Sequence, residues 1–143
     1  MTPIDTTTRP EQDLVFTRLL QTLLVTAVLV SIVHYVDNVV RFEDYAPAGA
    51  GLVTAPLVAA SWFVLTGFGL WGYLSYRRGR YRSAAVGLAV YSVSGLVGVV
   101  HYREVSPSDF DPLQNTFVSL DIVLGAAILA TACRLAWRPP GGA

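Results

Sequence analysis

One long apolar stretch, residues 19–40, limits the fold of this chain more than any other part of the sequence. It contains 22 consecutive residues without Lys, Arg or Glu. A helix needs roughly 20 mainly apolar residues to cross the hydrocarbon core of a bilayer, so the stretch predicts a transmembrane helix. Its last two turns carry His34, Asp37 and Asn38. Ionisable side chains inside a span are costly and most often functional, so this end of the helix is a candidate site.

Three further apolar stretches follow, separated by short polar loops. The spans that we predict are residues 19–40, 56–76, 83–103 and 113–135. Only 14% of the residues are charged, against roughly 25% in a typical soluble domain. We therefore expect an all-α integral membrane protein, one domain over residues 1–143, whose four transmembrane helices form an up-down four-helix bundle.

Local signals mark the ends of the predicted helices. Pro56 lies at the start of the second span, where a first helical turn tolerates proline, and Thr54 is a candidate N-cap. The pair Asp111–Pro112 predicts an N-cap followed by a first-turn proline at the start of the fourth span. We expect residues 1–13 to be a polar tail outside the membrane.

The distribution of arginine predicts the orientation. The loop between the second and third spans carries four basic residues and no acid, namely Arg77, Arg78, Arg80 and Arg82. By the positive-inside rule this loop is cytoplasmic, and both termini then lie on the same side. The chain contains no Lys and is rich in Ala, Gly, Val and Leu, a composition that fits a bacterial source. We therefore predict a multi-pass protein of the bacterial cytoplasmic (inner) membrane, with Tyr35, Tyr45 and Tyr102 at its outer interface.

Charge and cysteine content limit the partners. The net charge is zero, so no global field attracts nucleic acid. The lipid bilayer is the expected partner, and the four-arginine loop could hold anionic lipid headgroups. A homo-oligomer or a complex with another membrane protein is compatible with the sequence. The single cysteine, Cys133, excludes an intramolecular disulfide, and we expect it to act as a small apolar residue.

Three predicted spans each place polar and small residues on one helix face, at steps of three and four. The members of these faces are Ala27, Ser31, His34, Asn38 and Arg41; Gly87, Tyr91, Ser94, Gly98 and His101; and Gln114, Asp121, Gly125 and Ala132. Small residues allow close helix packing in lipid, so these faces should point into the bundle. We predict a polar cluster of His34, Asp37, Asn38, His101 and Asp121 near the extracytoplasmic side. The nearest polar neighbours of His34 should come from the third and fourth spans.

The cluster supports several interpretations. In the leading one the protein is not an enzyme, and the cluster is either a structural tie between spans or a ligand site. A buried Asp121 needs a partner in either case, because an unpaired carboxylate is costly in a membrane. The main competing interpretation is a divalent-metal site formed by His34, His101 and Asp121, which are suitable ligand types for zinc or iron.

Three more functions are compatible with histidine and aspartate at this depth. Two histidines on different helices could be the axial ligands of a b-type haem. A chain of Asp and His could relay protons or move a substrate. His34 could also be the general base of an outward-facing membrane enzyme. No nucleophile motif accompanies it, so the sequence leaves enzymatic activity undecided.

A short sequence match suggests an internal duplication. His34–Tyr35 ends the first span and His101–Tyr102 ends the third, and each pair is followed by an acidic loop, a helix and arginines. Two hairpins of the same orientation would form a 2+2 parallel repeat.

Overall fold

The computed structural model describes residues 8–45, 53–104 and 106–137, and all regular structure in these ranges is helical. The elements are α1 (Thr8–Val40), α2 (Phe42–Tyr45), α3 (Ala55–Arg77), α4 (Tyr81–Leu96), a 3-10 turn η1 (Val97–Val100), α5 (His101–Glu104) and α6 (Pro112–Trp137). No strand occurs in the described ranges. The prediction of an all-α protein is therefore confirmed.

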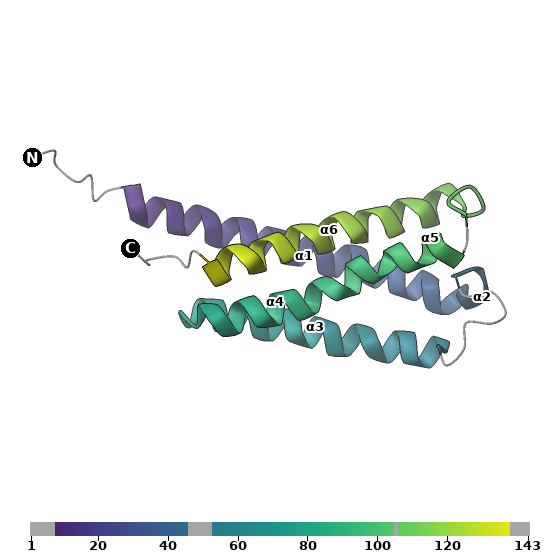
Figure 1. Cartoon of the computed structure of the whole chain (residues 1–143), viewed down its shortest axis with the longest axis horizontal. Helices are drawn as coiled ribbons and strands as arrows, with labels where there is room; N and C mark the ends of the chain where they lie inside the picture. The colour runs from purple at the N-terminus through teal and green to yellow at the C-terminus, as the bar shows by residue number, and fades with distance from the viewer. Residues whose placement is uncertain (1–7, 46–52, 105, 138–143) are drawn as a thin grey trace, which may run out of the picture.

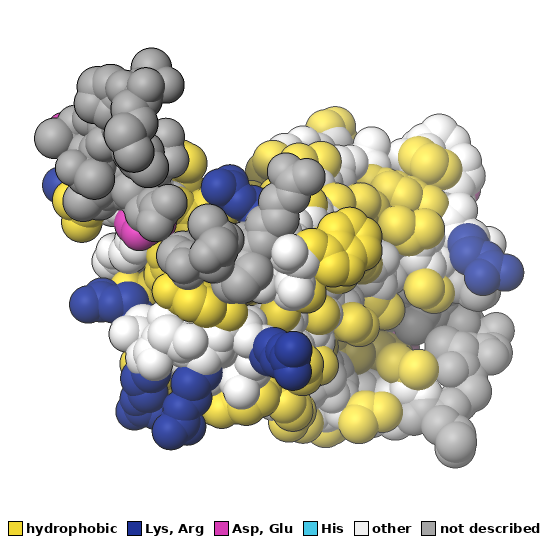
Figure 2. All heavy atoms as spheres, turned by 60° about the vertical axis from the view of Figure 1, so that its left-hand side comes forward, with side chains coloured by type: hydrophobic (Ala, Val, Ile, Leu, Met, Phe, Trp, Pro, Cys, Tyr) yellow, Lys and Arg dark blue, Asp and Glu magenta, His cyan; other side chains and the backbone are white. Residues whose placement is uncertain are grey.

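Four helical segments are long and apolar enough to cross a membrane: Asp13–Val40, Ala55–Arg77, Tyr81–Arg103 and Pro112–Trp137. Each exposes large apolar side chains that a soluble protein would bury, such as Leu29, Phe63, Val86 and Val123. Hydrophobic side chains form broad patches on the face in Figure 2, and arginines gather at its lower left. The surface is thus suited to contact with lipid, as expected of a multi-pass membrane protein.

The long helices lie side by side, with α1 and α4 running one way along the long axis and α3 and α6 the other (Figure 1). The short helices α2 and α5 lie together at one end of the molecule, which we name the α2 end. At the opposite end, Gly79 adopts a left-handed backbone with φ of +69° and turns the chain from α3 into α4. Helix α4 packs against both α3 and α6, and α1 packs against α3 and α6.

Glycine allows α4 and α6 to approach until their backbones touch. A Cβ atom added at Gly95 would collide with the backbone carbonyl of Asp121. One added at Gly125 would lie 2.9 Å from the backbone nitrogen of Leu96. Close approach of this kind is the usual source of helix association in lipid, where no hydrophobic force acts between helices.

The structure adds two features at the helix ends that the sequence does not predict. Helix α1 begins at Thr8, so part of the predicted polar tail is helical. The third span is not one continuous α-helix, because α4 ends at Leu96 and a 3-10 turn precedes α5. The predicted cap at Asp111 is confirmed, since its Oδ1 accepts hydrogen bonds from the backbone N–H groups of Leu113 and Gln114 at 2.8 and 2.9 Å. Thr54 is the N-cap residue of α3 but makes no side-chain cap bond.

Substitution of Gly95 by Ala should destabilise the protein by about 1–3 kcal/mol, because the added methyl group forces α4 away from α6. Gly67→Ala is the matched control, since a Cβ there meets nothing within 4 Å. The control should be neutral or stabilising by up to about 1 kcal/mol, through its better helix propensity. Thermal unfolding of both variants in detergent checks this. Equal melting temperatures for the two variants would contradict the close α4–α6 contact.

Candidate functional site

The polar faces predicted from the sequence point into the protein. Arg41 is exposed and His101 is partly buried. The other polar members are at most 6% exposed, namely Ser31, His34, Asn38, Ser94, Gln114 and Asp121. Buried polar groups need hydrogen-bond partners, so the partners of these side chains define the site.

The shortest of these contacts joins α1 to α6. His34 Nδ1 lies 2.6 Å from Asp121 Oδ2, and both side chains are 3% exposed. The ring donates its Nδ1–H in the tautomer that suits a charged carboxylate, which can only accept. The other ring nitrogen, His34 Nε2, is buried and has no hydrogen-bond partner in the described part of the chain. The Asp121 contact thus fixes the orientation of the ring and leaves one nitrogen open for chemistry.

The second histidine of the cluster lies beside the first. The rings of His34 and His101 have centroids 5.8 Å apart. The side-chain amide of Asn38 donates to His101 Nε2 at 3.1 Å. Asn38 and His34 are four residues apart on α1, so they lie on the same helix face. That face therefore carries His34 itself and the amide that orients His101. The predicted neighbours of His34 from the third and fourth spans are therefore present.

Tyr35 and Tyr45 do not face the membrane interface as the sequence predicts, since they are 8% and 2% exposed, and both expectations are corrected. The Tyr45 side chain packs on both histidines, with ring centroids 4.9 Å from His101 and 5.8 Å from His34. Its hydroxyl donates to Asp37 Oδ2 at 2.7 Å. Burial and the Asp37 carboxylate raise the pKa of Tyr45, so the phenol remains a donor at neutral pH. Nothing in the helix periodicity indicates this, because the contact depends on how α2 folds back over the cluster.

Asp37 is only partly buried, with 24% of its side chain exposed. It contacts Tyr45 and also Arg41, whose Nε lies 3.4 Å from Asp37 Oδ1. Arg41 Nη1 donates to Asp111 Oδ2 at 2.6 Å, and this bridge ties the end of α1 to the start of α6. Backbone donation from Gln114, followed by the Arg41 contact, lowers the pKa of Asp111. These partly exposed charges lie at the α2 end of the molecule.

A cavity of about 250 Å³ adjoins the histidines, between α1, α3 and α4. Its polar lining comprises His34, Tyr35, Asn38, Ser61, Ser94 and His101, and the remaining wall is Val53, Leu57, Val58 and Val97. The sequence does not predict Tyr35 and Ser61 as site residues, since a lone hydroxyl in a span is a weak signal. The cavity places buried polar groups beside an apolar wall, which is the usual character of a small-molecule site.

The predicted metal ligands do not form a recognisable coordination group. Among the described residues, no set of three or more His, Cys, Asp and Glu side chains is arranged to hold a metal ion. The divalent-metal and haem hypotheses stay predictions of the sequence alone. Cys133 is exposed, on the lipid-facing side of α6.

The arginines predicted to fix topology and to hold anionic lipid lie together. Arg77, Arg78, Arg80 and Arg82 are all exposed around the turn between α3 and α4. They are at the opposite end of the molecule from the histidines (Figure 1).

Comparisons with protein-family models, with curated proteins and with solved structures find no match to this chain.

A double-mutant cycle should detect the His34–Asp121 pair. Asp121→Leu alone should destabilise the protein by about 3 kcal/mol, because it leaves a buried imidazole without its partner. Adding His34→Leu should recover most of this loss, since an apolar pair of similar size needs no partner. Chemical or thermal unfolding in detergent measures both free energies. Additive effects of the two substitutions would show that the groups do not interact.

The bridge at the α2 end should make stability sensitive to acid. The fold lowers the pKa of Asp111, so its charged form stabilises the protein at neutral pH. This contribution is lost as the pH falls below the ordinary value of 3.8 and through the lowered folded-state pKa. Asp111→Asn keeps an N-cap but cannot titrate. Its melting temperature should therefore fall less between pH 6 and pH 3 than that of the wild type. An equal fall in the melting temperatures of the two proteins would show that the charge on Asp111 does not stabilise the fold.

Proposed function

We propose that this chain is a ligand-binding protein of the bacterial cytoplasmic membrane, with its site at His34 in the outer half of an up-down four-helix bundle. Both termini and the four-arginine loop are cytoplasmic in this proposal, and the α2 end faces outward. The positive-inside rule supports this orientation, because the arginine cluster and the acid-rich α2 end lie at opposite ends of the molecule.

The observation that carries the proposal is the open nitrogen of His34. Its Nε2 is buried without a partner in the described ranges, while Asp121 holds the opposite side of the ring. An unsatisfied buried polar atom costs about 1–3 kcal/mol. A purely structural tie explains the Nδ1 contact, but it explains neither the open Nε2 nor the cavity next to it. A ligand that hydrogen-bonds to Nε2 accounts for both.

The cavity indicates the class of ligand. Its volume of about 250 Å³ suits a compact molecule. Neutral imidazole presents a lone pair at Nε2 when Nδ1 carries the proton, so the ligand offers an O–H or N–H donor. The valine and leucine wall requires an apolar body. A small aromatic or aliphatic alcohol that reaches the site from the membrane or the outer surface has these properties.

A matched pair of test ligands checks this role of His34. 1-Naphthol has a hydroxyl donor and an apolar body, and naphthalene lacks the donor. At a hundredfold excess over its Kd, 1-naphthol should raise the Tm of the purified protein by roughly 5 °C. Naphthalene should have no such effect, and neither compound should stabilise His34→Leu. Equal shifts by 1-naphthol in the wild type and in His34→Leu would exclude His34 as the binding group.

Cysteine labelling in intact cells tests the orientation. In a Cys133→Ala background, Ser108→Cys lies in the exposed loop before α6, and Arg80→Cys lies in the exposed turn before α4. A membrane-impermeant maleimide should label Ser108→Cys in intact cells and Arg80→Cys only after permeabilisation. The reverse pattern would place the His34 site on the cytoplasmic side.

A further inference from the structure

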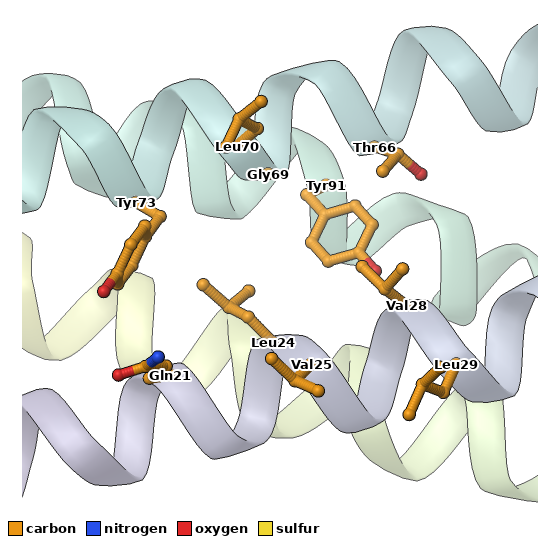
Figure 3. Close-up of a pocket in the computed structure, with 10 residues that line it drawn as sticks. All are labelled: Gln21, Leu24, Val25, Val28, Leu29, Thr66, Gly69, Leu70, Tyr73 and Tyr91. Carbon is orange, nitrogen blue, oxygen red and sulfur yellow. The ribbon is translucent and has the colours of Figure 1, made fainter.

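A second cavity lies between α1 and α3, closer than the histidines to the end that holds the four-arginine loop. Its volume is about 380 Å³ and its lining is almost entirely apolar. Its walls include Leu24, Val25, Val28 and Leu29 of α1 and Gly69 and Leu70 of α3. Figure 3 shows Leu24 and Val28 of α1 beside the space between the two helices, with the ring of Tyr91 from α4 reaching into it. We name this cavity the α1–α3 groove.

The absence of a side chain at Gly69 opens the groove. A Cβ atom at this position would lie 2.8 Å from the ring of Tyr91, so α3 rests directly on that ring. The ring of Tyr91 forms one wall of the groove, between α1 and α3. From Gln21 to Leu29 the groove extends over nine residues of α1, or about 12 Å of helix. Its shape is long, narrow and apolar.

The groove closes at the end that holds the four-arginine loop. There the hydroxyl groups of Thr17 and Tyr76 lie 2.8 Å apart and join α1 to α3. Each is followed in sequence by an arginine, Arg18 and Arg77. Each residue of a helix is rotated by roughly 100° about the helix axis from the residue before it. Because α1 and α3 are antiparallel, the rotation from Thr17 to Arg18 and the rotation from Tyr76 to Arg77 go to the same side of the Thr17–Tyr76 contact. Both arginines therefore lie on one side of it.

That side is the side of the groove. Gln21 lies one turn after Arg18, and Tyr73 lies one turn before Arg77, and both line the groove. Arg77 Nη1 also donates to the Tyr73 hydroxyl at 3.2 Å. Both arginine side chains are exposed, and neither forms an ion pair with an acid in the described ranges.

We propose that the α1–α3 groove binds one acyl chain of an anionic phospholipid, with its phosphate held between Arg18 and Arg77. An apolar channel that ends at two cations from different helices matches a molecule with a long chain and an anionic head. Arginine binds phosphate oxygens through several N–H donors at once. The site is separate from His34 and does not depend on the proposed function.

The charge distribution favours this occupant over a neighbouring helix. The apolar pocket farther along the same helices, at the α2 end, is lined by Val36, Val40 and Phe63. The arginine at that end, Arg41, is already paired with Asp37 and Asp111. The α1–α3 groove, in contrast, lies beside two arginines that form no ion pair in the described part of the chain.

Native mass spectrometry of the full chain in detergent micelles tests the proposal. The test lipids are dioleoyl phosphatidylglycerol and dioleoyl phosphatidylcholine, which have the same chains and differ in net charge. The wild type should retain phosphatidylglycerol in preference to phosphatidylcholine. The variant R18Q/R77Q should bind phosphatidylglycerol about 30-fold more weakly, since each arginine near a membrane surface contributes about a factor of five. R80Q/R82Q removes the same charge from the neighbouring turn and should retain wild-type affinity.

A second pair of variants tests the chain-binding part. Val25→Trp fills the groove and should reduce phosphatidylglycerol binding, whereas Val123→Trp, on the lipid-facing side of α6, should not. Circular dichroism confirms that each variant is folded. Equal losses of phosphatidylglycerol binding in R18Q/R77Q and R80Q/R82Q would show that the lipid responds only to general surface charge, and would overturn the proposal. A protein dimer that Val25→Trp abolishes, without any lipid adduct, would also overturn it and assign the groove to a second copy of the chain.

Discussion

The need to pair one buried carboxylate determines how the helices of this protein meet. Asp121 lies in the apolar sequence of α6 and is 2% exposed. In a membrane no water can solvate it, so a partner from another helix is required. His34 supplies that partner at 2.6 Å and thereby sets the height of α1 against α6. Gly95 brings the backbone of α4 onto the backbone of Asp121 itself. Polar pairing and close packing thus act at the same level of the molecule.

The rest of the α2 end follows from this arrangement. Once His34 faces inward, Asn38 lies one turn further along the same helix face and orients His101. Tyr45 then packs on both imidazoles. Its hydroxyl donates to Asp37, which contacts Arg41, and Arg41 in turn pairs with Asp111, the cap of α6. The α3 side of the cluster is less filled, and there the cavity lies. Helix α3 therefore encloses the candidate site without contributing an ionisable group to it.

Much of this arrangement could be predicted from residue order alone. Span length and the three- and four-residue spacing of polar groups identify the buried faces, because both follow from helix geometry. The break in the third span could not be predicted, since Val97–Val100, which forms a 3-10 turn, has the composition of an apolar helix. The burial of Tyr45 could not be predicted either, because it depends on the fold of α2 after Arg41. The open nitrogen of His34 requires knowledge of every neighbour, which spacing does not supply.

The central claim is that Asp121 holds His34 with its Nδ1 protonated and its Nε2 free. Nitrogen-15 NMR of the protein labelled in histidine measures this directly, with His34→Leu used to assign the signals. We predict an Nδ1-protonated ring at neutral pH, with a strongly deshielded Nδ1 proton that exchanges slowly and disappears in Asp121→Leu. An Nε2-protonated ring, or an Nδ1 signal that Asp121→Leu leaves unchanged, would contradict the account.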